Sequence, residues 1–232
     1  MATCRIHREQ PLFDADVIDR FGKLASSLIS DVFDRWSGAG DVLPVSGLKP
    51  GQIVVGAALT VRTRPGDNLA VHKALDLGRP GEILVVAAGG AIDRAIIGGL
   101  MGHYATRQGF AAVIVDGAIR DLSDLEAKAP PTFARGVSHL GPYKDGPGDI
   151  RCSVAINGLP VHDGDLIVAD EDGITCVPRT RIYEILELAE AKAANEADQD
   201  AAIAEDRWNR SWVDASLDIV HVDDSADGRV LD

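Results

Sequence analysis

The sequence has few cysteines, no excess of positive charge and no long apolar run, and each of these absences argues against particular classes of protein. Its three cysteines, Cys4, Cys152 and Cys176, lack CxxC spacing, so we expect free thiols and no disulfide framework or thiolate zinc site. The net charge of −13 argues against a nucleic-acid partner, because phosphate backbones are held by clustered lysine and arginine. No run approaches the roughly 20 apolar residues of a membrane helix, and the polar start MATCRIHREQ does not resemble a signal peptide. We therefore expect a cytoplasmic protein with no membrane partner.

What the sequence does contain is typical of a globular protein, with 46% hydrophobic and 25% charged residues in a chain of 232. The acidity is concentrated at the end, since residues 184–232 carry 14 acidic and only 4 basic side chains. We predict a single domain over residues 1–203 and an acidic C-terminal extension over 204–232. Two interpretations of this extension remain open. It packs at a subunit interface through Trp208 and Trp212, or it is a loose tail.

The spacing of apolar residues predicts an α/β fold in the first half of the chain and mostly short strands in the second half. The expected elements of the first half are two helices within 13–36, a strand over 53–63, a helix capped by Asp67 or Asn68 and ending near Gly78, a strand over 82–88, a helical stretch over 91–108, a strand over 110–115 and a short helix over 122–127. Short strands separated by turns are expected over 132–177, followed by a helix from Ile182 to about Ala202.

The first candidate for chemistry is the pair Arg120–Asp121, which follows the apolar strand FAAVIV. Open α/β sheets bind ligands beyond the carboxyl ends of their strands. The planar guanidinium of arginine grips carboxylates, and an aspartate can hold a hard divalent cation through oxygen. The alternative is a loop salt bridge in which Asp121 caps the following helix.

The second candidate is the segment Gly98–Gly99–Leu100–Met101 at the expected start of a helix. Small residues there would leave backbone amides open to an anion, although glycine pairs also serve close helix packing. His103 lies one turn further along the same helix. It is either an acid/base group or a histidine on a surface or interface.

Several longer strings together resemble the RraA-like family: PGDNLAVHKALDLGRPGEILVV, the glycines at 89 and 90, GLM at 99–101, VDGAIRDLSDL, TFARGV, GPYK and GDLIVADEDGITCVP. They occur in consistent order over about residues 15–190. The resemblance implies an α/β fold of the swivelling β/β/α type, a sandwich of mixed sheets flanked by helices. It also implies a homotrimer, or a hexamer of two trimers, with sites near subunit interfaces.

The same resemblance implies two possible functions. The family contains divalent-metal pyruvate aldolases that cleave 4-hydroxy-4-methyl-2-oxoglutarate or 4-carboxy-4-hydroxy-2-oxoadipate and often decarboxylate oxaloacetate. We therefore expect a lyase that uses Mg²⁺ or Mn²⁺ and converts a small 2-oxo acid to pyruvate through a metal-stabilised enolate. The family also contains regulators of ribonuclease E, so the alternative is a non-catalytic protein that binds a ribonuclease or another protein.

By this resemblance, Arg120 corresponds to the arginine that binds the pyruvate portion, and Asp121 corresponds to the direct metal ligand. Both are expected to be catalytic. The segment Gly98–Met101 is expected to bind substrate, with the backbone amides of Leu100 and Met101 receiving it.

Gly99 departs from the pattern, because the family's aldolases carry an aspartate there that orients or deprotonates water. Asp124 matches a further acidic position of the motif and is expected beside the site. His103 is a candidate for supplying the acid/base function lost at Gly99. Oxaloacetate decarboxylation needs no base to remove a hydroxyl proton, so we expect it to survive the change at Gly99 better than aldol cleavage.

Overall fold

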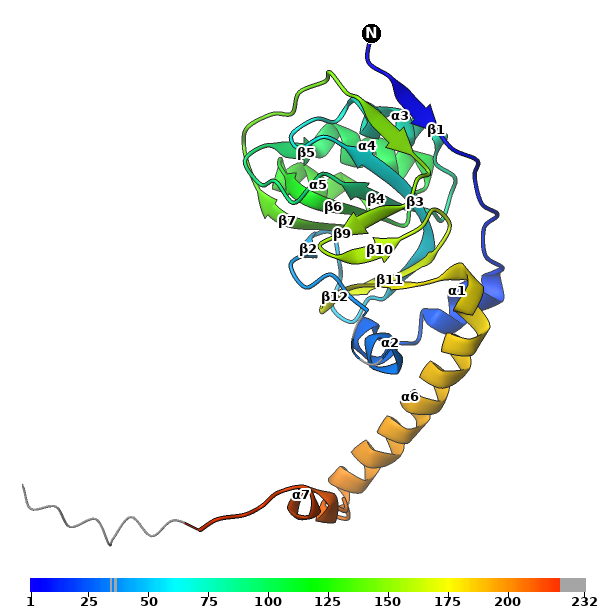
Figure 1. Ribbon diagram of the computed structural model, residues 1–232, viewed down its shortest axis with the longest axis vertical. Helices are drawn as coiled ribbons and strands as arrows, with labels where there is room; N and C mark the ends of the chain where they lie inside the picture. The colour runs from blue at the N-terminus through cyan, green and yellow to red at the C-terminus, as the bar shows by residue number, and fades with distance from the viewer. Residues whose placement is uncertain (34, 36, 222–232) are drawn as a thin grey trace, which may run out of the picture. The chain divides into compact units, whose positions relative to one another are not determined.

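A computed structural model describes residues 1–33, 35 and 37–221 of the chain (Figure 1). The chain divides into two units, Met1–Ala193 and Ala194–Asp232. This division falls inside a long helix, α6 (Ile182–Ala204), and so lies earlier than the boundary expected at residue 203. A single domain over 1–203 stays a prediction.

The first unit is built on a ten-stranded mixed sheet. Its main path runs β1 (Cys4–Ile6), β8 (Gly148–Ile150), β3 (Val54–Thr63), β4 (Ile83–Ala87), β6 (Ala112–Ile119), β7 (Thr132–Val137) and β2 (Leu43–Ser46). Strands β3, β4, β6 and β7 are parallel neighbours, whereas β2 joins β7 and β8 joins β3 in the antiparallel sense. Off this path, β5 (Ala95–Ile97) pairs with β6, and β11 (Leu166–Asp170) pairs with β3 and β12 (Gly173–Val177). A separate hairpin joins β9 (Val154–Ile156) and β10 (Leu159–Val161).

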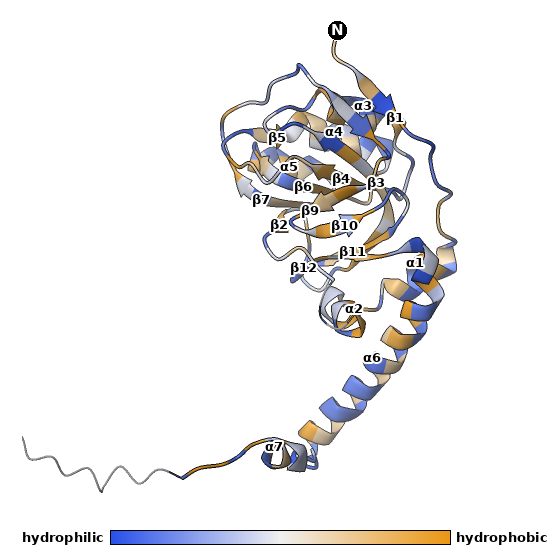
Figure 2. Ribbon diagram, viewed as in Figure 1, coloured by the Kyte–Doolittle hydropathy of each residue, from blue (hydrophilic) through white to orange (hydrophobic). Residues whose placement is uncertain are grey.

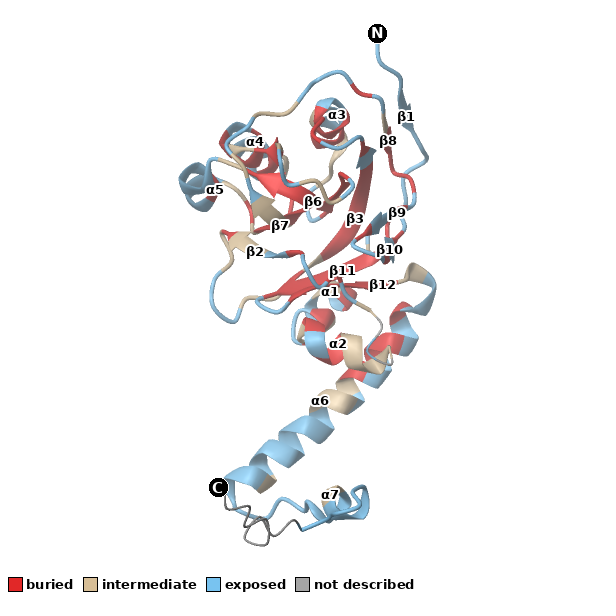
Figure 3. Ribbon diagram, turned by 60° about the vertical axis from the view of Figure 1, so that its left-hand side comes forward, coloured by how far each residue is buried: buried red, intermediate tan, exposed pale blue. Residues whose placement is uncertain are grey.

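Helices and small strands cover both faces of the parallel strands, which explains why those strands are continuous apolar runs in the sequence. On one face, α3 (Leu69–Leu77), α4 (Gly99–Gln108) and α5 (Leu122–Lys128) share a buried core with β3, β4 and β6. The other face packs against β9–β12. A third cluster joins α1 (Ala15–Phe21), α2 (Ser26–Val32) and the start of α6. Figure 3 shows the buried strand β3 in red, and Figure 2 shows the apolar colour of the central strands. The expected α/β class and flanked mixed sheet are confirmed.

Two expected boundaries are wrong in the stretch before the site. Residues 95–97 form strand β5 and not helix, because this fully buried apolar triplet pairs with the end of β6. The helix itself begins at Gly99, which agrees with the start expected near Gly98. Strand β6 continues past residue 115 to Ile119. Asp116 can stay within the buried strand because its carboxylate accepts a hydrogen bond from Arg135 at 3.3 Å.

Of the two residues expected to cap the helix at 69, Asp67 is the one that does so. Asp67 accepts a hydrogen bond from the amide of Leu69 at 2.9 Å, as a residue before a helix does, whereas the Asn68 side chain makes no capping bond. Strands β1, β2 and β8 were not expected, because segments of three or four residues are too short to show alternation.

The second unit contains the end of α6 and a short helix, α7 (Ser211–Ala215), where the sequence predicted irregular chain. Trp208 and Trp212 are 38% and 59% exposed, so both interpretations of this extension stay open. Residues 222–232 of the predicted extension lie outside the described residues. Of the helices that the structure describes, none has the length and apolar character needed to cross a membrane.

Candidate active site

The candidate site lies where β6 ends and α4 begins, beyond the carboxyl ends of the parallel strands. The Arg120 amide donates to the carbonyl oxygen of Ile97 at 3.0 Å, which ties the end of β6 to the end of β5. A cavity of about 210 Å³ opens here. It is lined by Asn68, His72, Ile96, Gly98, Leu100, Met101, Arg120, Asp121, Pro142 and Lys144. The structure therefore brings together the two segments singled out in the sequence, Gly98–Met101 and Arg120–Asp121.

Two glycines make room for the Arg120 side chain. A Cβ atom built on Gly98 would lie 3.0 Å from Arg120 Cγ, and one built on Gly141 would lie 3.0 Å from Arg120 Nη1. Arg120 Nε lies 3.5 Å from Asp121 Oδ2, with the two side chains 40% and 45% exposed. An exposed pair at this distance is weakly held, so both groups remain available to a ligand.

Asp121 has a left-handed backbone, with φ of 59°. Few non-glycine residues adopt this conformation, and such residues gather at functional sites. Although Asp121 precedes α5, its side chain makes no cap bond to that helix, and its carboxylate accepts the amide of Gly99 at 3.1 Å. Of the alternative expected for this pair, the salt bridge and the N-cap position of Asp121 are present, but the capping hydrogen bond from its side chain is not.

Helix α4 presents its first turn to the cavity. Amides in the first turn of a helix have no acceptor within that helix, and their dipoles favour negative charge. The Gly99 amide is used by Asp121, which leaves the amides of Leu100 and Met101, two residues that line the cavity. This arrangement can receive a carboxylate or a developing oxyanion next to the Arg120 guanidinium.

The metal-binding groups that the cavity offers suit a metal ion that keeps much of its hydration shell. No group of three or more His, Cys, Asp or Glu side chains that could hold a metal occurs among the described residues. Mg²⁺ is commonly held by one or two carboxylates, with water and substrate oxygens completing its shell. The half-exposed Asp121 carboxylate at the cavity fits that mode, whereas a site formed wholly by this chain's side chains does not.

Gly99 and Asp124 lie against each other at the start of α4. A Cβ atom on Gly99 would lie only 2.5 Å from Asp124 Cβ and 3.2 Å from its Oδ2. The Asp124 side chain thus fills the space that a side chain at position 99 would need. The Asp124 carboxylate is exposed and accepts a hydrogen bond from Lys128 Nζ at 2.9 Å. Neither Asp124 nor His103, which is also exposed, lines the cavity.

Sequence reasoning missed the three polar residues of the opposite cavity wall, Asn68, His72 and Lys144. The Asn68 side chain is 2% exposed, and its Nδ2 donates to Ile96 O at 2.8 Å and to Met101 Sδ at 3.1 Å. Asn68 and His72 are four residues apart at the start of α3, a spacing that places both on one helix face. That spacing is the signal that could have found them.

His72 is electrostatically coupled to the rest of the wall. Burial lowers the pKa of its imidazole from 6.5, the positive charge of Lys144 lowers it further, and Asp76 opposes the shift. At neutral pH the ring is therefore uncharged and can accept or donate a proton.

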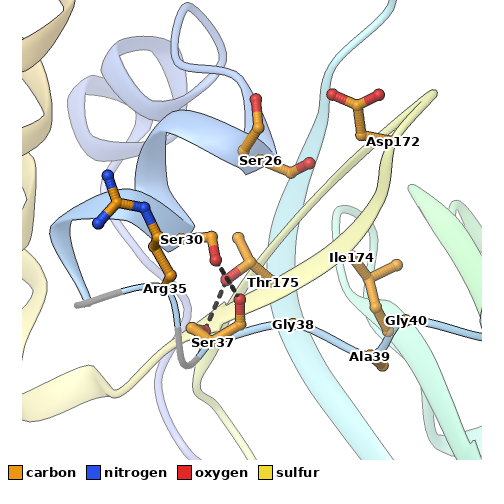
Figure 4. A pocket seen from close by; sticks show the side chains of 11 residues that line it. Ser26, Ser30, Arg35, Ser37, Gly38, Ala39, Gly40, Asp172, Ile174 and Thr175 are labelled. Carbon is orange, nitrogen blue, oxygen red and sulfur yellow. Dashed lines mark hydrogen bonds between the residues drawn. The ribbon is translucent and has the colours of Figure 1, made fainter. Parts of the chain in front are cut away.

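A second hollow, of about 350 Å³, lies between α2 and β12 (Figure 4). Its hydroxyl groups are already occupied: Ser30 Oγ donates to Ser37 O at 2.6 Å, and Ser37 Oγ lies 2.7 Å from Thr175 Oγ1. Ser26 Oγ donates to Asp170 at 2.6 Å. Among the described residues that line this hollow, the hydroxyl groups that could act in catalysis are therefore engaged in hydrogen bonds within the protein.

Known proteins resemble this chain in sequence. The RraA-like family model, described as Aldolase/RraA, matches residues 26–176. A relative from Halalkalibacterium halodurans, named "Putative 4-hydroxy-4-methyl-2-oxoglutarate aldolase", is 35% identical over 192 residues, covering 83% of this chain and 90% of the relative. One from Thermus thermophilus, named "4-hydroxy-4-methyl-2-oxoglutarate aldolase", is 32% identical over 112 residues, covering 48% of this chain and 68% of the relative.

Solved structures show the same fold. An uncharacterized protein from Pseudomonas syringae pv. tomato matches with a TM-score of 0.75 and 26% identity, over 86% of this chain and 93% of the other. The structure described as the RNA-processing inhibitor RraA, from Thermus thermophilus, matches with a TM-score of 0.60 and 27% identity, over 66% of this chain and 92% of the other.

Proposed function

The chain belongs to the RraA-like family, and on this premise we propose that it is a lyase that cleaves a small 2-oxo acid to pyruvate. One observation carries the proposal. A cavity of about 210 Å³ is lined by an arginine, an aspartate and the first turn of a helix. The relatives named as aldolases support the same reaction class. The proposed substrates are 4-hydroxy-4-methyl-2-oxoglutarate and oxaloacetate.

Each group has a distinct task in this proposal. Arg120 binds the carboxylate of the pyruvate portion through its planar guanidinium. The amides of Leu100 and Met101 bind the remaining oxygens at the start of α4. Asp121 would hold Mg²⁺ or Mn²⁺, which when bound supplies positive charge beside the 2-oxo acid.

The bond that breaks lies between C3 and C4 of the substrate. In oxaloacetate its electrons pass to C3 as CO₂ leaves, and in the aldol substrate the C4 hydroxyl also loses its proton. Both routes give the enolate of pyruvate, whose oxygen gains negative charge next to Arg120. In the aldol route the hydroxyl proton passes to water, and C4 becomes the carbonyl carbon of a second pyruvate, which leaves. A proton added at C3 completes the first pyruvate, and the uncharged His72 is an imidazole of the cavity that can exchange protons there.

We further propose that the protein acts as a homo-oligomer with the site near an interface. Leu100, which lines the cavity, is 90% exposed in the single chain. Apolar exposure of this kind is typical of a surface covered by another protein. The exposed members close to the site in sequence are Leu100, Tyr104, Leu122, Leu140 and Tyr143.

Pyruvate release from the two substrates tests the reaction. The assay compares Mg²⁺, Mn²⁺ and a chelator in the wild type, Arg120→Ala and Asp121→Ala. We expect metal-dependent turnover in the wild type and a loss of a hundredfold or more in Arg120→Ala, the order found when a charge-stabilising donor is removed, about 10²–10³. Turnover that persists in Arg120→Ala would refute the assigned roles.

The alternative of a non-catalytic regulator rests on the similarity to the structure described as an RNA-processing inhibitor. The same assay separates the two functions. A wild type with no turnover above the metal-only background favours binding of a ribonuclease or another protein, and would direct the search to such partners.

A further inference from the structure

We infer that a hollow lined by Arg5, Arg62 and Arg64 binds a small anion with two or more negative charges, carried by carboxylate or phosphate groups, and that this anion fastens strand β1 to strand β3. The hollow, called the arginine hollow below, has a volume of about 530 Å³. Its lining is completed by Thr3, Thr63, Pro147, Gly148 and Asp149. It shares no lining residue with the cavity at Arg120, so it is a separate site that does not depend on the proposed reaction.

The charge at the arginine hollow is positive although the chain as a whole is strongly acidic. Of the four charged residues in its lining, three are arginines and one is an aspartate, whereas the whole chain has a net charge of −13. Arg64 also pairs with Asp67 and Asp145 at 3.2 Å, but neither of these carboxylates lines the hollow. A hollow whose walls carry one sign of charge raises the local concentration of ions of the opposite sign. The lining therefore favours an anionic ligand.

A single carboxylate, that of Asp149, holds two of the three arginines. Its Oδ1 accepts a hydrogen bond from Arg5 Nε, and its Oδ2 accepts Arg5 Nη2 at 3.1 Å and Arg62 Nη2 at 2.7 Å. These hydrogen bonds hold the pKa of the buried carboxyl well below its usual range, so it stays ionised. Hydrogen bonding to Asp149 raises the pKa of Arg62, whereas the charge of Arg5 acts in the opposite direction. The two guanidinium charges therefore repel each other across one shared carboxylate, and a bound anion would relieve that repulsion.

The unused polar groups of the three arginines are hydrogen-bond donors. Each guanidinium has five N–H donors. Within the part of the chain that the structure describes, Arg5 and Arg62 form hydrogen bonds only through Nε and Nη2, and Arg64 only through Nη2. Their side chains are 68%, 56% and 46% exposed, so a ligand can reach the remaining donors. Carboxylates and phosphates are the groups that the planar guanidinium grips best.

The arginines belong to different parts of the sheet. Arg5 is on β1, whereas Arg62 is on β3 and Arg64 follows it, and β8 lies between these two strands. Strand β1 is a three-residue edge strand that is exposed along its whole length (Figure 3). A short exposed strand with few buried contacts opens more easily than the core of a sheet. An anion held by Arg5 and Arg64 together would therefore stabilise β1 against opening.

Calorimetric titration with citrate and with tripolyphosphate tests the site, and acetate is the monovalent comparison. The buffer contains no Mg²⁺, because both multivalent probes chelate it. The variants Arg5→Gln and Arg64→Gln each remove one charge from the lining. Arg8→Gln is the matched control, because Arg8 lies on the same N-terminal segment as Arg5 but does not line the hollow. Arg120→Ala shows whether the probes bind at the catalytic cavity instead.

We expect the wild type to bind at least one of the multivalent probes and to bind acetate far more weakly. Arg5→Gln and Arg64→Gln should each weaken binding roughly tenfold, the effect of losing one charge-assisted hydrogen bond, whereas Arg8→Gln and Arg120→Ala should bind as the wild type does. Tighter binding of citrate identifies a polycarboxylate ligand, and tighter binding of tripolyphosphate identifies a phosphorylated one. The inference is overturned if the wild type binds neither probe, if it binds acetate equally well, if either lining variant binds like the wild type, or if a control variant loses as much affinity.

Amide hydrogen exchange tests the link between the strands, and it remains informative if Arg5→Gln loosens β1. The amide of His7, directly after β1, donates to Ile150 O at 3.0 Å. Exchange of this amide should slow when the tighter probe binds to the wild type. It should slow less in Arg64→Gln at the same probe concentration, because this variant leaves the contacts of Arg5 in place. An equal exchange rate with and without bound probe would overturn the link between β1 and β3.

Discussion

Replacing Gly99 by aspartate should destabilise this protein, although the family resemblance implies that aldolases of the family carry an aspartate at this position. The reason is local. Asp124 occupies the space beside Gly99, and a new Cβ would lie 2.5 Å from Asp124 Cβ, a separation that real Cβ atoms essentially never show. Because Asp124 Cβ is attached directly to the backbone, rotation of the Asp124 carboxylate alone cannot relieve the clash.

The expected magnitude follows from opposing contributions. Overpacking of this kind costs about 1–3 kcal/mol. Two carboxylates at roughly 4 Å repel by about 1 kcal/mol where water screens them. Replacing glycine in a helix returns about 0.5–1 kcal/mol, and a negative charge in the first turn returns about 0.3–1 kcal/mol. The net loss in Gly99→Asp is about 2 kcal/mol, which for a chain of this length lowers the melting midpoint by roughly 4–8 °C.

Thermal unfolding of four proteins tests this reasoning: the wild type, Gly99→Asp, Asp124→Ala and the double variant. Removing Asp124 should make room for the new side chain, so the double variant should be at least as stable as Asp124→Ala. Gly40→Asp is the matched control, because no atom lies within 4 Å of a Cβ built on Gly40. A Gly99→Asp midpoint equal to that of the wild type, or a double variant with no recovery, would refute the steric account.

Two further predictions concern titratable groups. Hydrogen bonds from Arg5 and Arg62 hold the pKa of the buried Asp149 carboxyl well below its usual 3.8, so its stabilising effect is complete above pH 3.8 and is lost as the pH falls through the folded-state value. Asp149→Asn should therefore lower the urea midpoint by the same amount at pH 7 and at about pH 5, and the difference should shrink below pH 3.8; a difference that grows in acid would contradict this. In Lys144→Met, the pKa of His72 should rise, because one of the two influences that lower it is removed. Proton NMR titration measures the shift, and an unchanged pKa would place Lys144 away from the ring.

The sequence alone predicts the helices and strands whose apolar residues recur at regular spacing, and it predicts which charged residues follow the end of a strand. The long strand over 53–63, the helix that ends near Gly78 and the pair Arg120–Asp121 all lie as predicted. Strand β5 was missed because its three apolar residues look like one helical turn until their pairing with β6 is known.

The cavity wall formed by Asn68, His72 and Lys144 could not be predicted from the sequence for a related reason. Lys144 comes from a loop that only tertiary contacts with Gly66 and Asp67 bring over α3. Asn68 looked like a helix cap, since asparagine is common at that position, but its side chain turns to Ile96 and Met101. Local patterns report the chain's own preferences, whereas these positions are set by contacts between distant segments.

The most direct test of the central claim is the exchange of pyruvate methyl protons with deuterium, followed by NMR in D₂O with Mg²⁺. The exchange reports the formation and protonation of the enolate alone, and it requires no cleavable substrate. We predict exchange in the wild type that stops with a chelator and is lost in Asp121→Asn and Arg120→Ala. Exchange that continues at the wild-type rate in these variants, or a wild type that exchanges no faster than Mg²⁺ alone, would contradict the assignment of this cavity as a pyruvate-forming active site.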